Sequence, residues 1–140
     1  MRIRERVNVQ GTFGEATTDG VVDTGAELSL IPASLAGRIG AWPTAYQRTV
    51  LGVHQDARTL PIVAVTLILP RFKVAGQFLF AMAEVGEDLI LGMDILAPLG
   101  ISVDAGTQNL FVRNEVWEAF KTFAALGILV VGGVKLLGKK

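Results

Sequence analysis

The stretch Val21-Val22-Asp23-Thr24-Gly25-Ala26 places a carboxylate, a hydroxyl and a glycine directly after a pair of β-branched residues. A second apolar run, residues 28–32, follows, so the polar segment lies between two strand-like segments. Asp-Thr-Gly is also good turn chemistry in its own right, because aspartate and glycine both suit tight turns. The segment occurs once in 140 residues, and this single copy limits any chemistry that needs two carboxylates.

The composition indicates one domain and excludes several kinds of site. A chain of 140 residues can bury a usable core. The 13 basic and 13 acidic residues cancel, so we expect no nucleic-acid partner, which would need a concentrated basic face. Cysteine is absent and His54 is the only histidine, so we expect no disulfide, no metal site and no cofactor. No apolar segment follows the N-terminal arginines, and a cytoplasmic location is therefore the expected one.

Short strand-like runs between turn signals predict an all-β domain. Glycines and prolines separate these runs at the spacing of such a domain. The runs are residues 3–9, 20–23, 28–31, 49–53, 60–69, 72–80, 89–91, 101–103 and 110–112. Residues 104–109 read as a hairpin turn. Two short helices are also expected, one capped by Ser34, and one capped by Asp94 and ended by Pro98.

A faint internal repeat pairs residues 9–13 with residues 74–78. The first copy precedes the Asp23 segment, and the second precedes Leu89-Ile90-Leu91-Gly92. Two similar β-units would suit a pseudo-symmetric domain, but a match this short is also compatible with coincidence.

The Asp23 segment suits peptide hydrolysis by two carboxylates that share one proton. One carboxylate acts as a base on water, and the other donates a hydrogen bond or a proton to the carbonyl oxygen. Asp19, Asp56, Asp94 and Asp104 stand in no comparable context. The economical source of the second carboxylate is a symmetric dimer whose axis passes between two copies of Asp23.

Two landmarks together resemble the retropepsin-like aspartic proteases, which are single-domain and homodimeric. The first is Asp23-Thr24-Gly25-Ala26 followed by Leu28-Ser29-Leu30-Ile31-Pro32, and the second is Ile90-Leu91-Gly92. The resemblance covers roughly residues 3–113 and implies a closed β-barrel. It implies a catalytic role for Asp23, Thr24 and Gly25, with the Thr24 hydroxyl gripping the partner loop.

The same resemblance implies where substrate binds. Backbone at Gly25 and Ala26 would contact the substrate main chain, and a flap hairpin over residues 49–55 would close on it. Leu51, Gly52 and Val53 are the candidate flap contacts, with Gly52 at the tip. Viral members usually carry an arginine after the second landmark, where this chain has Met93, so the ion pair made by that arginine is absent.

The chain after the barrel changes in character. We divide it into a protease-like domain, residues 1–114, and an apolar tail, residues 115–140, that is expected to be helical because its apolar residues recur at helical spacing. Residues 116–138 could anchor the chain in a membrane, form a dimer helix, or pack on the barrel. The charge-free part is shorter than the ~20 residues of a typical span.

These observations predict an aspartic endopeptidase that acts as a homodimer on peptides in extended form. Activity is expected at acidic to mildly acidic pH, where the pair of carboxylates holds one proton. The alternative is a non-catalytic β domain of the same fold that serves dimerisation or peptide binding.

Overall fold

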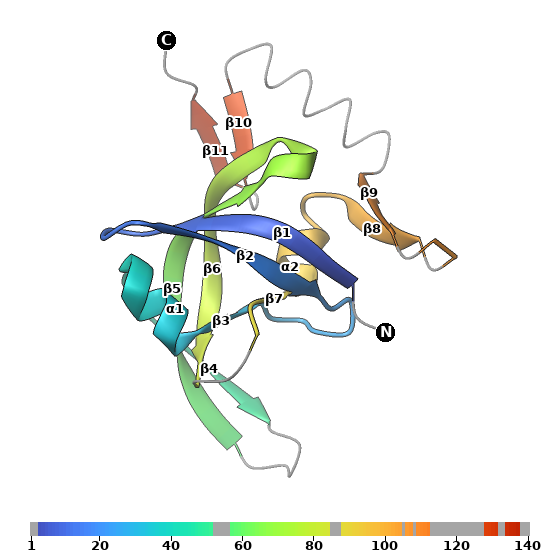
Figure 1. Cartoon of the computed structure of the whole chain (residues 1–140). Coiled ribbons are helices and arrows are strands. Elements are labelled where there is room, and N and C mark those ends of the chain that lie inside the picture. Colours follow the sequence, from blue (N-terminus) through green and yellow to red (C-terminus); the bar gives the residue numbers. More distant parts are fainter. Residues whose placement is uncertain are drawn as a thin grey trace.

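The computed structural model describes residues 3–51, 57–84, 88–104, 106–107, 109–112, 128–131 and 134–137. Strands make up most of it, which confirms the all-β prediction (Figure 1). They are β1 (Ile3–Gln10), β2 (Glu15–Val22), β3 (Leu30–Pro32), β4 (Trp42–Leu51), β5 (Ala57–Leu69), β6 (Val74–Ala83), β7 (Ile90–Leu91), β8 (Ile101–Asp104), β9 (Asn109–Val112), β10 (Ile128–Val131) and β11 (Val134–Leu137). The helical segments are α1 (Ala33–Ile39), the short 3-10 helix η1 (Pro70–Phe72) and α2 (Met93–Leu96).

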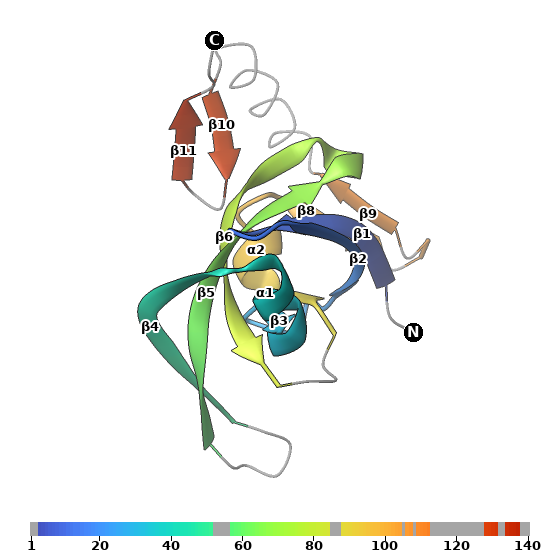
Figure 2. The same cartoon turned by 60° about the vertical axis from the view of Figure 1, so that its left-hand side comes forward.

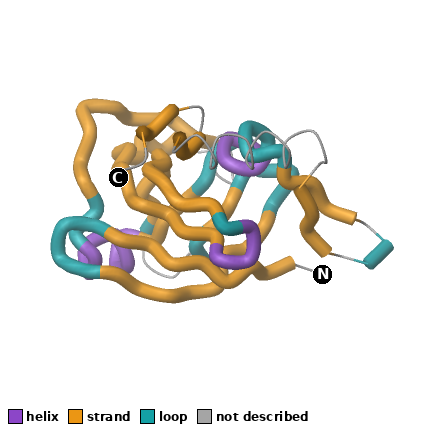
Figure 3. The backbone as a smooth tube through the Cα atoms, turned by 90° about the horizontal axis from the view of Figure 1, so that it is seen from above, coloured by secondary structure: helices purple, strands orange, loops and turns teal. Residues whose placement is uncertain are grey.

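Six strands close into a barrel in the order β1-β2-β7-β3-β6-β5. The ring closes because β1 pairs with β2 on one side and with the end of β5 on the other, where Val9 lies opposite Leu67. β4 pairs with β5 and lies outside the ring, and the β4–β5 hairpin projects from the barrel as an arm (Figure 2). Seen from above, the helical segments lie apart from one another around the strands (Figure 3).

The barrel consists of two similar units, β1-β2-β3-α1 and β5-β6-β7-α2. Each begins with an antiparallel hairpin, whose second strand pairs in parallel with the short strand of the other unit. β2 pairs in this way with β7, and β6 with β3. The two short strands meet antiparallel at Leu30 and Ile90, so an approximate twofold relation passes between them.

The predicted pseudo-symmetry is therefore present, but the sequence repeat that suggested it is wrong. Residues 11–14 form the turn between β1 and β2, whereas residues 74–78 lie inside β6. The turn that corresponds to residues 11–14 is at η1, between β5 and β6. The similar sequences at residues 9–13 and 74–78 therefore occupy structurally different positions in the two units.

Alternating apolar residues fill the barrel. Along β5, Val65, Leu67 and Leu69 are buried while the residues between them are partly exposed. This period of two is expected for strands that face the interior on one side only. Phe80 from β6 and Ile31 from β3 are among the largest fully buried side chains. The ends of β2 and β7 are buried in this interior, and the Asp23 segment begins directly after β2.

Both predicted short helices exist, but neither starts with its predicted cap. α1 has Pro32 at the N-cap and no side-chain capping bond, so the prediction for Ser34 is wrong. α2 has Gly92 at the N-cap and ends at Leu96, before Pro98 as expected. Asp94 lies in the first turn of α2, where its carboxylate binds a different loop instead of capping the helix.

The predicted hairpin at residues 104–109 is confirmed, with β8 and β9 paired and Asp104 opposite Asn109. The Gly106 amide donates to the Asp104 carboxylate at 2.9 Å. Hydrogen bonds from Gly106 and then from Thr107 hold the pKa of Asp104 below its ordinary value.

Arg71 of η1 connects this hairpin to the barrel. Its guanidinium donates to the Glu5 carboxylate of β1 at 3.2 Å and also to the Leu110 carbonyl of β9. The same group lies over the Phe72 ring, 4.8 Å from its centroid. Glu5 is only 6% exposed. Burial raises the pKa of the Glu5 carboxyl, and the nearby Arg71 opposes that rise.

The helical prediction for the C-terminal tail is wrong where the structure describes it. β10 and β11 form an antiparallel hairpin, with Val131 opposite Val134, beside β6 (Figure 1). The physical reason is visible in the sequence, because Gly132-Gly133 favours a two-residue turn and the flanking valines favour strands. Residues 113–127 lie outside the described residues. Within the described part, no helix has the length and apolar character needed to cross a membrane.

Candidate active site

The Asp23 segment lies in the loop that joins β2 to β3. Strand β2 ends at Val22, and the residues that follow leave the barrel interior, so Asp23, Thr24 and Gly25 are all exposed. Val21 and Val22 are buried just before the loop and anchor its start in the core. The structure therefore brings the three predicted catalytic residues together at one solvent-facing position.

The loop is fixed at both ends, by the last residue of β7 and by the first residue of α2. The Asp23 amide donates to the Leu91 carbonyl at 3.0 Å, and the Met93 amide donates to the Ala26 carbonyl at 2.8 Å. Within the loop, the Ala26 amide donates to the Asp23 carbonyl at 3.1 Å. Both backbone polar groups of Ala26, a predicted substrate contact, thus have partners inside the chain.

A local hydrogen bond orients the Asp23 carboxylate. The Gly25 amide donates to Asp23 Oδ1 at 3.0 Å. This is the side-chain turn that aspartate favours two residues before a free backbone amide. A Cβ atom at position 25 would lie 3.3 Å from Asp23 Oδ1, so the glycine keeps the space beside the carboxylate open. The Asp23 carboxylate therefore has a fixed orientation and is accessible from solvent.

A cavity of about 360 Å³ lies beside the loop. Asp23 and Thr24 line it together with apolar side chains from β1, β2, β7 and β8: Ile3, Val21, Val22, Ile90 and Val103. Two polar residues in an otherwise apolar lining is the usual composition of a binding pocket. Thr24 is exposed here, and its predicted grip on a partner chain stays a prediction.

The second sequence landmark, Ile90-Leu91-Gly92, lies beside the first, because β7 is the neighbour of β2 in the sheet. Parallel pairing of β2 with β7 places Val21 opposite Ile90 and Val22 opposite Leu91, so Gly92 follows β7 at the level where Asp23 follows β2. A Cβ at Gly92 would approach the Ala26 carbonyl oxygen to 2.8 Å. The two segments that the sequence singled out are therefore in direct contact.

Ser29 and Asp94 are part of this arrangement, and sequence reasoning missed them. Ser29 is fully buried, and its hydroxyl donates to Asp94 Oδ1 at 2.6 Å and accepts from the Gly92 amide at 2.8 Å. The Ser29 amide also donates to Asp94 Oδ2 at 3.1 Å. The signals in the sequence were a serine inside the apolar run of residues 28–32 and the position of Asp94 directly after the second landmark, where it was interpreted as a helix cap.

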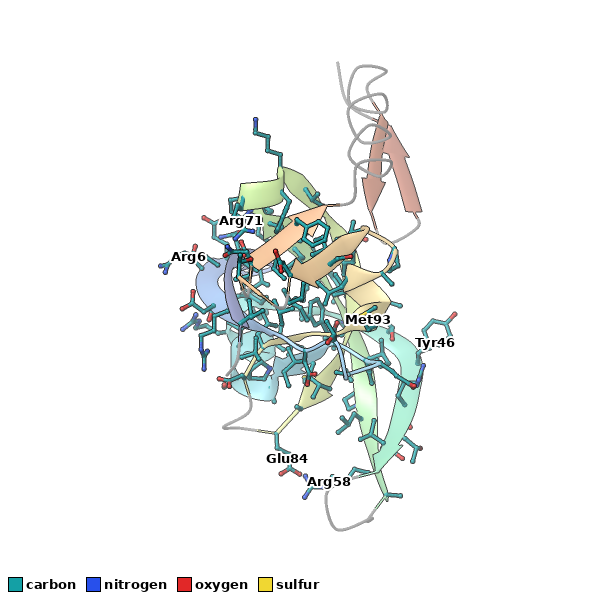
Figure 4. The ribbon with its side chains drawn as sticks, turned by 90° about the vertical axis from the view of Figure 1, so that its right-hand side faces the viewer. Arg6, Tyr46, Arg58, Arg71, Glu84 and Met93 are labelled. Carbon is teal, nitrogen blue, oxygen red and sulfur yellow. The ribbon has the colours of Figure 1, made fainter. Side chains whose placement is uncertain are left out.

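The predicted flap falls on the β4–β5 arm. Leu51 ends β4 and pairs with Ala57 of β5, while Gly52, Val53 and His54 lie outside the described residues. Arg58 and Glu84 approach to 3.1 Å near the far end of the described part of the arm, and Tyr46 projects from β4 into solvent (Figure 4). A hairpin is therefore present where the flap was expected, and the role of its tip stays a prediction.

The charged residues near the loop do not assemble into a metal site. In the part of the chain that is described, no three histidine, cysteine, aspartate or glutamate residues lie close enough together to hold a metal ion.

Comparisons with known proteins agree with this arrangement. A model of the aspartyl protease family matches residues 9–95, more than half of the chain, including the Asp23 loop and Gly92. Among solved structures, the chain is similar to EIAV protease complexed with the inhibitor HBY-793, with a TM-score of 0.56 and 23% identity over 74% of this chain and 93% of that one. It is also similar to the retroviral protease-like domain of Ddi1 from Leishmania major, with a TM-score of 0.52 and 22% identity over 79% and 89%.

No curated protein matches the chain significantly. At the identities of the two solved structures, their likeness shows the fold, and the retropepsin-like barrel inferred from the sequence is confirmed.

Proposed function

This chain belongs to the aspartyl protease family, and from that premise we propose that it is an endopeptidase that works as a homodimer. Water is activated by two Asp23 carboxylates, one from each chain. The observation that carries the proposal is the exposed Asp23 carboxylate on a loop that backbone hydrogen bonds fix at both ends. Each chain contains one such Asp-Thr-Gly segment, so a pair of carboxylates needs two chains.

The two carboxylates divide the chemistry between them. The ionised Asp23 accepts a proton from water while that water attacks the peptide carbonyl carbon. The protonated Asp23 of the other chain hydrogen-bonds to the carbonyl oxygen and donates its proton as the oxygen gains charge. Because the pair must hold one proton, activity is expected at acidic to mildly acidic pH.

The substrate is a peptide in extended form. Main-chain hydrogen bonds to the loop and to the β4–β5 arm would add it as a strand, and apolar pockets beside the cleaved bond would favour hydrophobic side chains. Leu51, Gly52 and Val53 stay the predicted contacts from the arm, and Gly25 and Ala26 those from the loop.

Cleavage of a diverse peptide library by the purified chain, across about pH 3 to 7, tests the proposal. Asp23→Asn removes the proton exchange but keeps the size of the side chain, so kcat/KM should fall by at least about 100-fold. Asp19→Asn is the matched control, because Asp19 is an exposed carboxylate of β2 that lies 3.7 Å from the Arg6 guanidinium and outside the Asp23 loop. Its cleavage rate should equal that of the parent chain.

Two outcomes would count against catalysis by Asp23: no cleavage by the parent chain, or equal cleavage by Asp23→Asn. Peptide binding without cleavage would instead favour the alternative, a non-catalytic domain of the same fold.

A further inference from the structure

A continuous series of hydrogen bonds leads from the backbone of Asp23 to the carboxylate of Asp94. The Asp23 amide donates to the Leu91 carbonyl at 3.0 Å. The next amide along that chain, Gly92, donates to the Ser29 hydroxyl at 2.8 Å, and this hydroxyl donates to Asp94 Oδ1 at 2.6 Å. Every donor in the series points the same way, and the series ends on a negative charge.

The Leu91 carbonyl and the Gly92 amide are the two ends of one peptide group. That peptide is therefore held between Asp23 on one side and Ser29 on the other. Hydrogen bonds that share a polarisable group strengthen one another, and a charged acceptor strengthens the bond that it receives. The Asp94 carboxylate thus acts on the bond that fixes the backbone of Asp23.

The hydrogen bonds of the Asp94 carboxylate are all made to Ser29 among the described residues. Its second oxygen accepts from the Ser29 amide at 3.1 Å, so both carboxylate oxygens bind the same residue. Asp94 does not cap α2, whose N-cap is Gly92, and no ion pair to Asp94 is formed among the described residues. Ser29 has no exposed surface and cannot contact a substrate.

We propose that Asp94 is a positioning residue for Asp23, acting through Ser29 and the Leu91–Gly92 peptide. The proposal rests on the proposed function only for its effect on catalysis, because the fixing of the Asp23 backbone can be measured in an inactive protein as well.

Amide hydrogen exchange of the full chain, followed by NMR at Asp23 and Gly92, tests the positioning directly. Ser29→Ala removes the hydroxyl and leaves the buried Gly92 amide without its acceptor, so exchange at both amides should accelerate by about tenfold. Asp94→Asn keeps the shape of an exposed side chain but loses one acceptor, and should give a smaller acceleration at the same amides. Amides of Val65 and Phe80 in the barrel should exchange as in the parent chain.

Kinetics test the consequence for the reaction. A displaced loop misplaces the reacting carboxylate, so kcat should fall by about 10- to 100-fold in Ser29→Ala while KM changes less than about threefold. Ser29→Thr keeps the hydroxyl and should recover most of the loss. The double variant Ser29→Ala with Asp94→Asn should lose no more than Ser29→Ala alone, because the two groups act as one unit.

Controls separate this effect from general destabilisation. Ser34→Ala removes a hydroxyl that caps no helix, and Asp19→Asn neutralises an exposed carboxylate elsewhere; both should match the parent chain in exchange and in kcat. Unchanged exchange at Asp23 in both Ser29→Ala and Asp94→Asn would overturn the proposal. If the parent chain cleaves no peptide yet exchange accelerates as expected, the proposed function fails and the positioning role stands.

Discussion

At the scale of single residues, Gly92 is required by the space around it and not by its backbone angles. Its φ of −94° and ψ of −175° are open to any residue. A Cβ atom, however, would lie 2.8 Å from the Ala26 carbonyl oxygen and 3.0 Å from the Leu28 carbonyl carbon, and both are backbone atoms that cannot rotate away. The glycine therefore lets the Asp23 loop lie directly against the start of α2.

Gly92→Ala should consequently destabilise the fold by about 1–3 kcal/mol, the usual cost of overpacking. It should also lower kcat, because the loop must move away from β7. Urea denaturation measures the first effect and peptide cleavage the second. Gly37→Ala in α1 is the matched control: nothing lies within 4 Å of its new Cβ, and alanine favours a helix by up to about 1 kcal/mol. Equal stability of Gly92→Ala and the parent chain would contradict this account.

The family resemblance singled out the segments of Asp23 and Gly92, which the structure places in contact, but it did not identify the pair Ser29 and Asp94. Asp23 and Gly92 carry their chemistry in short segments of characteristic composition. The bond between Ser29 and Asp94 joins residues 65 positions apart, and it depends on where β3 and α2 lie relative to one another. With only local sequence to judge from, an aspartate directly before an apolar pair, as Asp94 is before Ile95-Leu96, reads as a helix cap.

At the scale of elements, the contact between β1, η1 and β9 depends on a buried charge. Glu5 is 6% exposed and pairs with Arg71, whose guanidinium also donates to the Leu110 carbonyl of β9. The raised pKa of Glu5 shows that burial penalises its charged form more than Arg71 favours it. The folded state therefore binds this proton more readily than the unfolded chain does.

The sign of the pH dependence follows from linkage. Stability from Glu5 is fully present below the ordinary pKa of 4.5 and is lost as the pH rises through the raised pKa of the folded state. Glu5→Gln keeps an acceptor for Arg71 without the charge, so the stability of the variant should not fall as the pH rises through the raised pKa of Glu5. In urea denaturation at several pH values, it should match the parent chain near pH 4 and equal or exceed its stability at pH 7, by ~1 kcal/mol at most.

Glu84→Gln provides the control, because Glu84 is an exposed glutamate that also pairs with an arginine, Arg58. Its stability relative to the parent chain should show no such trend between pH 4 and 7. A Glu5→Gln variant that is clearly less stable than the parent at pH 7 would mean that the ion pair with Arg71 outweighs the cost of burial.

The elements with the clearest sequence patterns were predicted well, and those with competing signals were not. Strand β5 alternates buried and partly exposed residues and was recognised with an error of three residues at its start, whereas β2 and β4 begin five and seven residues before the predicted runs. In the tail, helical spacing in residues 116–124 was extended through Gly132-Gly133, where the glycines and valines favour the observed hairpin of β10 and β11. Local turn chemistry outweighed the apolar periodicity there.

At the scale of the whole molecule, the barrel is pseudo-symmetric but its two units are not equal in chemistry. The loop after β2 carries Asp-Thr-Gly, whereas the corresponding segment between β6 and β7, residues 84–89, has no such sequence. The fold could be inferred from two short landmarks, but the exchange of strands between the units depends on long-range pairing that no local pattern encodes. Membrane association through residues 116–138 and a cytoplasmic location stay predictions from the sequence.

Because only one of the two units carries Asp-Thr-Gly, we predict that two chains share one active site. Mixing the parent chain with inactive Asp23→Asn chains, under conditions where subunits exchange, produces three kinds of dimer. If each site needs one Asp23 from each chain, mixed dimers are inactive and activity falls with the square of the parent fraction. An equal mixture should then retain about a quarter of the activity of the same total concentration of parent chain.

Mixing with Asp19→Asn chains should cause no loss, because those chains carry an intact Asp23. Sedimentation should show the same dimer for the parent chain and for Asp23→Asn, so that the loss reports on the site and not on assembly. A linear fall to about one half would mean that each chain acts alone. A second carboxylate would then have to come from within the same chain, where none of the other aspartates stands in an Asp-Thr-Gly segment.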